Sequence, residues 1–237
     1  MNTATDLAET INREDALLEI AEQLCEAGDN ILFFASFVKT LDRDDKKSWL
    51  REFPVNKNYV RKLLKSISTT PRLAIYKSRQ MTVTWTCLLF CLHEFLFKPG
   101  SNMAIISMTE GDAGSLLDKM KLMYDSLPEH WKLVLPSIKT YNGKGGIIVR
   151  MVADFGPDEP KGVIKACATN GNPGRGQTLS LCYWDEIGEQ KDDECRHMYS
   201  ALRPTLEGGG RLLMSSTPPR HPEHFWNQFC NGEYFGD

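Results

Sequence analysis

The sequence lacks a strong excess of charge of either sign. Its 237 residues carry 28 lysines and arginines against 31 aspartates and glutamates, for a net charge of -3 at pH 7. A protein that grips nucleic acid over its whole surface is usually basic. This near balance argues against a static DNA-binding protein, but it leaves room for a local basic face.

Paired cysteines are also missing. The seven cysteines are an odd number, and no two of them stand in a Cys-x-x-Cys arrangement. Cys87, Cys91 and Cys182 lie inside apolar runs, where a free cysteine behaves as a small hydrophobic residue. The pattern argues against a disulfide framework and fits a reducing cytoplasm.

No stretch of the sequence has the features of a membrane span. The most apolar run, residues 83–97, is too short to cross a bilayer and contains His93 and Glu94. The first residues are acidic where an export signal would be basic. We therefore expect no membrane association, and residues 83–97 predict a buried helix.

The N-terminal part differs from the rest in charge. Residues 1–30 contain eight acidic side chains and one basic, whereas residues 39–65 contain nine basic and four acidic. Apolar residues at helical spacing predict an amphipathic helix over about 13–27, and a phenylalanine cluster predicts a second, short helix over about 33–38. We interpret residues 1–50 as a helical appendage that covers the core; an arm that docks a partner is the alternative.

From Arg72 onward, short apolar runs alternate with predicted helices. Strands are expected at 73–76, 103–107, 147–152, 163–167, 179–184 and 211–215, and helices at 83–97 and about 110–126. Residues 147–152 and 163–167 are expected to pair with each other. The alternation predicts an α/β domain over residues 51–237, with parallel strands at the centre of its sheet.

Polar side chains follow three of these strands, at the sheet edge where open α/β proteins bind ligands. The first segment, KSRQMTVT (77–84), stands where a phosphate-binding loop would enter a helix. Of the Walker A pattern G-x-x-x-x-G-K-[ST] it keeps only Thr84, because Lys77 and Thr82 hold the glycine positions and Val83 holds the lysine position. Taken alone, the segment favours a basic strand-to-helix turn with a structural role over a phosphate-binding loop.

The second segment, Asp185-Glu186, follows a strongly apolar strand in the manner of a Walker B motif. Carboxylates at the edge of a dry core are costly unless they are paired with a metal or a cation. Asp185 can hold hydrated magnesium while Glu186 polarises the attacking water. The alternative is that Asp185 only caps the following helix. The third segment, SSTP (215–218), follows another strand, and its hydroxyls, Thr217 among them, could sense a γ-phosphate.

Taken together, the three segments resemble the ATPase domain of the large terminase subunit of tailed double-stranded DNA bacteriophages. The triplet Ser78-Arg79-Gln80 is the most distinctive element, because family members often read S-R-Q-x-G-K-[ST] there. The resemblance runs from about residue 50 to the end and includes residues 53–64, where the family places its adenine contacts. It implies a RecA-like P-loop NTPase fold, with a mostly parallel central sheet flanked by helices and an N-terminal helical appendage.

The resemblance also implies roles for individual residues. Some terminases move the phosphate lysine to the start of the loop, which makes Lys77 the candidate here. Thr84 and Asp185 would hold Mg²⁺, and Glu186, Arg79 and Arg175 would act in catalysis, Arg175 on a neighbouring subunit. The ATP-binding loop would comprise Lys77, Ser78, Arg79, Gln80, Met81, Thr82, Val83 and Thr84, with Thr217 near the γ-phosphate.

As a terminase the protein would be a DNA packaging motor, active in the cytoplasm of the host cell. Its partners would be double-stranded DNA, the portal protein and the small terminase subunit, with a homo-oligomeric ring in the assembly and a monomer alone. Terminases usually add a nuclease domain, and the roughly 20 residues after SSTP are too few for one, so an isolated motor domain or a fragment is expected. A helicase-type DNA translocase and a degenerate nucleotide-binding module without hydrolysis remain the alternatives.

Overall fold

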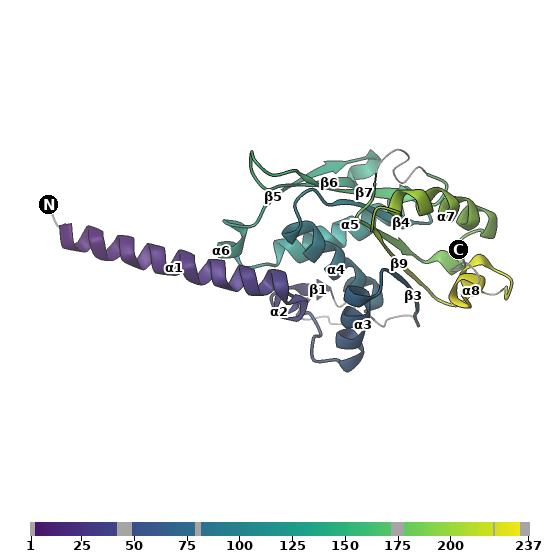
Figure 1. Ribbon diagram of the computed structural model, residues 1–237, viewed down its shortest axis with the longest axis horizontal. Helices are drawn as coiled ribbons and strands as arrows, with labels where there is room; N and C mark the ends of the chain where they lie inside the picture. The colour runs from purple at the N-terminus through teal and green to yellow at the C-terminus, as the bar shows by residue number, and fades with distance from the viewer. Residues whose placement is uncertain (1–2, 42–48, 79–81, 172–177, 220, 233–237) are drawn as a thin grey trace.

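A seven-stranded sheet forms the centre of the protein (Figure 1). The computed structural model describes residues 3–41, 49–78, 82–171, 178–219 and 221–232. The strands lie in the order β3 (Arg72–Tyr76), β9 (Arg211–Ser216), β8 (Leu181–Asp185), β4 (Asn102–Ser107), β7 (Gly162–Ala168), β6 (Ile148–Asp154) and β5 (Ser137–Asn142).

The strand directions follow the prediction. The neighbours from β3 to β7 are parallel, and β7, β6 and β5 are antiparallel. The two strands expected at 147–152 and 163–167 do pair with each other, as β6 and β7. The α/β class with a parallel centre is therefore confirmed.

Both faces of the sheet are covered, because its central strands are apolar on both sides. On β4, Met103 and Ile105 join one core, while Ala104 and Ile106 join another. This alternation is the two-residue period of a strand. The helices of the first, larger core are α3 (Asn58–Thr69), α4 (Val83–Phe97) and α5 (Glu110–Asp125); those of the second are α7 (Asp192–Leu206) and α8 (Phe225–Cys230).

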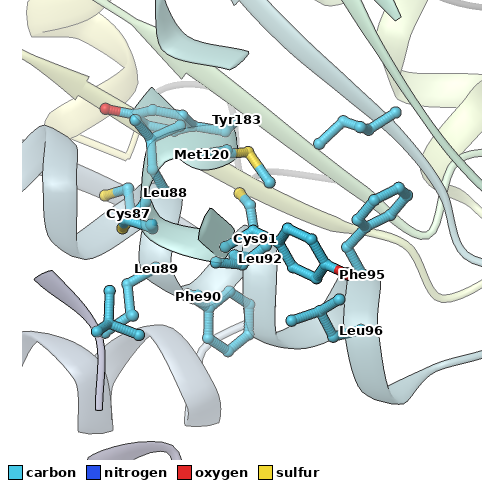
Figure 2. Close-up of a cluster of buried hydrophobic side chains, with 14 of the residues drawn as sticks. Cys87, Leu88, Leu89, Phe90, Cys91, Leu92, Phe95, Leu96, Met120 and Tyr183 are labelled. Atoms are coloured by element: carbon cyan, nitrogen blue, oxygen red, sulfur yellow. The ribbon is translucent and has the colours of Figure 1, made fainter. Parts of the chain in front are cut away.

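Helix α4 occupies the middle of the larger core (Figure 2). It is apolar on all sides, and 11 of its 15 residues are buried, which is typical of a helix enclosed by other elements. Its bounds are the ones predicted from the apolar run, and it contacts α3, α5, β7, β8 and β9. Since α4 starts beside the strand exits, this packing fixes the first turn of the helix at the site described below.

Helix α1 (Thr3–Asp29) extends away from the rest of the molecule in Figure 1. It is longer than the helix predicted over 13–27, and among the side chains described from residue 15 onward, the buried ones lie near its C-terminal end. Leu24 and Ala27 are buried, whereas Leu17 and Leu18 are exposed. The ring of His93 on α4 makes a hydrogen bond of 2.9 Å with the carbonyl of Ala27, which fixes the end of α1 to the core.

The second predicted helix is α2 (Ile31–Ser36), whose first turn is capped by the side chain of Asn30. A two-stranded antiparallel sheet of β1 (Lys39–Leu41) and β2 (Leu50–Glu52) follows. The division of the chain into residues 1–50 and 51–237 stays a prediction.

Three short helices and the free cysteines complete the description of the fold. The short helix α6 (Glu129–Lys132) lies between Pro128 and Pro136. Single-turn helices η1 (Lys144–Gly146) and η2 (Ile187–Glu189) complete the elements. All seven cysteines are free thiols, as expected. Among the helices that the structure describes, none combines the length and apolarity needed to cross a membrane.

Candidate active site

Lys77 leaves β3 and turns its side chain into the protein. Its backbone N–H donates to the carbonyl of Ser216 on β9, 2.9 Å away, which continues the parallel pairing by one residue. Its ammonium Nζ lies 2.7 Å from Asp185 Oδ1, 3.0 Å from Thr84 Oγ1 and 2.9 Å from Glu186 Oε1. The lysine thus brings together residues from two strand exits and the first turn of α4.

Asp185, at the end of β8, is almost fully buried, with 5% of its surface exposed. Its Oδ1 accepts hydrogen bonds from Lys77 and, at 2.6 Å, from Ser215 Oγ. Its Oδ2 accepts from Thr84 Oγ1 at 3.3 Å. Asp185 belongs to the strand and does not cap the following helix, so the helix-cap alternative is excluded for this residue.

The electrostatics of the site hold Lys77 in its charged form. Burial disfavours the ammonium ion, but the carboxylates of Asp185 and then Glu186 outweigh burial, and the pKa of Lys77 is raised above its ordinary value. A buried ion pair of this kind is tolerated only where hydrogen bonds satisfy the remaining polar atoms. The hydroxyls of Ser215 and Thr84 supply such bonds to Asp185.

Glu186 follows Asp185 in a left-handed backbone conformation, with φ of 55°. Thr82, before the first turn of α4, has φ of 58°, and these are the two non-glycine residues with positive φ among those described. Such conformations cost energy and persist where the surroundings enforce them, often at functional sites. Thr82 stands at a glycine position of the Walker A pattern, and it adopts the conformation that a glycine would favour there.

The residues present fit a magnesium–nucleotide group. Glu186 Oε1 is paired with Lys77, but its Oε2 is buried without a hydrogen-bond partner in the described part of the chain. A carboxylate, a hydroxyl and an acidic neighbour are the oxygen donors that magnesium takes in nucleotide sites, usually together with water and phosphate. Thr84, Asp185 and Glu186 supply this set within one small space.

The hydroxyl groups of SSTP, at the end of β9, make hydrogen bonds that the sequence did not predict. Ser215, which stands opposite Asp185 in the register of β8 and β9, bonds that carboxylate directly. Ser216 Oγ accepts a hydrogen bond of 2.8 Å from the backbone N–H of Gly188. Thr217 Oγ1 donates to Glu189 Oε1 at 3.1 Å, so in this structure Thr217 bonds the short helix η2. Its proposed role near a γ-phosphate stays a prediction.

Several predicted residues fall outside this description. Arg79, Gln80, Met81 and Arg175 lie outside the described residues. Ser78 is described and exposed. Val83 is 8% exposed and belongs to the larger core, so its side chain packs with apolar neighbours.

Sequence reasoning did not single out Tyr183 or Gln190, and it noted Ser215 only as part of the SSTP segment whose hydroxyls could sense a γ-phosphate. Gln190 is buried and donates from Nε2 to the backbone carbonyl of Asp185 at 2.9 Å, while its Oε1 accepts from Trp184 and Thr169. It therefore ties the end of β8 to the end of β7. Within LCYWD, Tyr183 reads as part of an apolar strand, and the only available signal was that a buried tyrosine hydroxyl usually needs a partner.

The sheet with its parallel centre, covered by helices on both faces, is the α/β fold expected from the sequence. Comparison with solved structures finds this fold in large terminases. The large terminase of bacteriophage HK97 matches with a TM-score of 0.61 and 12% identity, over 86% of this chain and 40% of that one. The predicted resemblance to terminase ATPase domains is thus confirmed at the level of fold.

Two further structures agree. An ATPase-domain mutant of the Thermus phage P74-26 large terminase matches with a TM-score of 0.52 and 17% identity, over 70% of this chain and 67% of that one. The large terminase of the thermophilic bacteriophage D6E in complex with ATP-gamma-S matches with a TM-score of 0.54 and 10% identity, over 75% of this chain and 42% of that one. No protein-family profile and no curated protein matches the sequence.

Proposed function

We propose that this chain is the ATP-hydrolysing motor domain of a phage terminase large subunit, which drives double-stranded viral DNA into the procapsid. One observation carries the ATPase part of this proposal. Lys77, Thr84, Asp185 and Glu186 meet within hydrogen-bonding distance at the carboxyl ends of parallel strands. The similar fold of the D6E large terminase, whose structure contains ATP-gamma-S, supports nucleotide binding at this edge.

The charged groups of the site suggest how the chain handles ATP. Lys77 has a flexible side chain that can leave the acidic pair for the β- and γ-phosphates. Thr84 and Asp185 would hold the magnesium ion, which would offset phosphate charge. Glu186 would orient the attacking water and accept its proton. The N-terminus of α4 faces the same region, and its dipole favours phosphate.

Two arginines complete the proposal. Negative charge builds on the γ-phosphate oxygens during transfer, and a fixed guanidinium stabilises it. We assign Arg79 to the phosphates within the same subunit and Arg175 to those of a neighbour. The motor would then work as a homo-oligomeric ring on the portal protein in the host cytoplasm, with the small terminase subunit delivering the DNA.

Steady-state ATP turnover by the purified chain, with and without Mg²⁺, tests the enzyme. We expect Mg²⁺-dependent hydrolysis in the wild type. Glu186→Gln should keep ATP affinity and lose at least about 100-fold in turnover, because only the transition state loses the interaction. Glu207→Gln, at an exposed residue beyond the end of α7, is the matched control and should behave as wild type.

The outcomes separate the proposal from its rivals. Tight ATP binding with no turnover in the wild type would identify a degenerate nucleotide-binding module. Turnover stimulated by single-stranded DNA and not by duplex would favour a helicase-type translocase. Stimulation by duplex DNA together with portal protein, and DNA uptake into procapsids, would support the packaging motor.

A further inference from the structure

A pair of hydroxyl groups lies directly beneath the candidate site. Tyr183 stands two residues before Asp185 on β8, so the two side chains lie on the same face of the sheet. Ser215 stands opposite Asp185 on the neighbouring strand β9. The Tyr183 hydroxyl lies 2.9 Å from Ser215 Oγ, which lies 2.6 Å from Asp185 Oδ1. Tyr183 and Ser215 have no exposed surface.

The direction of these hydrogen bonds follows from the number of protons. An ionised carboxylate only accepts, so Ser215 must give its single hydroxyl proton to Asp185. The bond between Tyr183 and Ser215 therefore needs the tyrosine as donor. A tyrosine phenol carries its proton near neutral pH, so Tyr183 has a proton to donate. The result is a one-way chain from Tyr183 through Ser215 to Asp185.

This chain becomes more important when Lys77 moves. In the structure, Asp185 Oδ1 accepts from both Lys77 and Ser215, while Oδ2 faces Thr84. If Lys77 turns to the phosphates, Ser215 is the donor to Oδ1 that remains among the described residues. Because Tyr183 is the donor in its bond with Ser215, the single hydroxyl proton of Ser215 stays available to Asp185.

Packing alone does not require a tyrosine at position 183. The other side chains of β8 from Leu181 to Trp184 are apolar or a free cysteine. In Figure 2 the ring of Tyr183 lies in the buried cluster beside Cys87 and Leu88 of α4. A phenylalanine would fill this space without a hydroxyl that needs a partner. The hydroxyl has found its partner in the residue that bonds Asp185.

We propose that Tyr183 is a positioning residue that acts through Ser215 to hold the Asp185 carboxylate with Oδ2 toward Thr84, and so sets the affinity of the nucleotide site for Mg²⁺. This inference rests on the proposed function. It does not require Tyr183 to touch the nucleotide. It predicts an effect on Mg²⁺ dependence that is larger than any effect on nucleotide binding without metal.

The test is the Mg²⁺ dependence of binding of a fluorescent ADP analogue, measured for the wild type, Tyr183→Phe, Ser215→Ala and the double variant. We expect Tyr183→Phe to raise the Mg²⁺ concentration at half-maximal binding about fivefold, the effect of one lost hydrogen bond. Binding in EDTA should stay unchanged. The double variant should match Ser215→Ala alone, because Tyr183 acts only through Ser215.

Two controls keep the test independent of folding. Tyr124→Phe removes the hydroxyl of another buried tyrosine, which bonds the carbonyl of Pro136 away from the site, and it should leave the Mg²⁺ dependence unchanged. Ser215→Thr keeps a hydroxyl and should bind Mg²⁺ more like the wild type than Ser215→Ala does. Thermal unfolding of each variant confirms that it is folded.

The outcomes separate this inference from the proposed function. The positioning role is overturned if wild type needs Mg²⁺ for binding but Tyr183→Phe shifts that need no more than Tyr124→Phe. It is also overturned if the double variant shows the sum of the effects that Tyr183→Phe and Ser215→Ala have separately on the Mg²⁺ dependence. If the wild type binds the analogue with Mg²⁺ but hydrolyses no ATP, the proposed motor function is wrong. The differences in Mg²⁺ dependence among the variants would still decide the role of Tyr183.

Discussion

Replacing Lys77 by methionine should destabilise the fold even without nucleotide. The side chains of Lys77 and Asp185 are each only 7% exposed, and their charged atoms are 2.7 Å apart. Lys77→Met keeps the length of the side chain but leaves the buried carboxylate, among the described residues, with the hydroxyls of Ser215 and Thr84 as its side-chain partners. Removing one partner of a buried pair costs about 3–5 kcal/mol, because the remaining charge is uncompensated.

Thermal unfolding in the absence of nucleotide measures this loss. For a chain of this length, about 3 kcal/mol lowers the melting temperature by roughly 6–12 °C. Lys161→Met is the matched control, because Lys161 forms a 2.8 Å ion pair with Asp154 while 56% of its side chain is exposed. Exposed pairs contribute about 0–1 kcal/mol, so the control should melt within a few degrees of the wild type.

Two further measurements test whether the loss of stability comes from breaking the buried ion pair. The double variant Lys77→Met with Asp185→Asn should lose less stability than the two single variants lose in sum, because Asp185 no longer leaves an unpaired charge. Since the folded pKa of Lys77 is raised, its contribution is fully present below the ordinary pKa of 10.5 and is lost as pH rises through the folded value. The gap between wild type and Lys77→Met should therefore be constant from pH 7 to about 10 and shrink above that. A Lys77→Met melting curve that overlays the wild type would refute the buried pair.

Three other predictions concern separate parts of the molecule. Mixing Arg175→Ala with Glu186→Gln subunits should restore ATPase activity above either variant alone if Arg175 acts in trans. Gly188→Ala should lower the melting temperature, because the new Cβ would lie 2.6 Å from the carbonyl oxygen of Thr217. Leu92→Ala, at a fully buried residue of α4, should cost about 2–5 kcal/mol in denaturant unfolding.

The sequence predicted best the elements whose signal is local. The apolar run 83–97 became α4 with the same bounds, because a helix whose side chains are mostly apolar on every side is stable only when it is buried. The strand before Asp185-Glu186 was predicted for the same reason, although it starts at Leu181 and not at 179. The alternation of such runs with helices was enough to predict the parallel centre of the sheet.

Elements that depend on distant partners could not be predicted. Strand β5 is mostly exposed, and its place in the sheet comes from pairing with β6. Helix α7 contains Pro204, which in the sequence reads as a helix end. The contact between Lys77 and Asp185 joins residues 108 positions apart. Motif spacing indicated that both belong to one site, but it could not show that the lysine and the carboxylate form a buried pair.

The proposed phosphate lysine, Lys77, stands away from the Walker A lysine position for a physical reason, and that reason makes one further prediction. Val83, at the Walker A lysine position, is 8% exposed and packs in the larger core, so a lysine there would have to bury its charge among apolar side chains. Lys77 instead reaches Thr84 and Asp185 from the end of β3.

Moving the lysine back should therefore fail. The double variant Lys77→Met with Val83→Lys should melt below Lys77→Met alone and should not regain Mg²⁺-dependent ADP binding. Lys77→Met with Val83→Ile is the control for a change of size at position 83, and it should melt close to Lys77→Met because the side chain stays apolar. Recovery of nucleotide binding by the double lysine variant would show that position 83 can face the phosphates, and the core packing of Val83 would then not be the reason for the displacement.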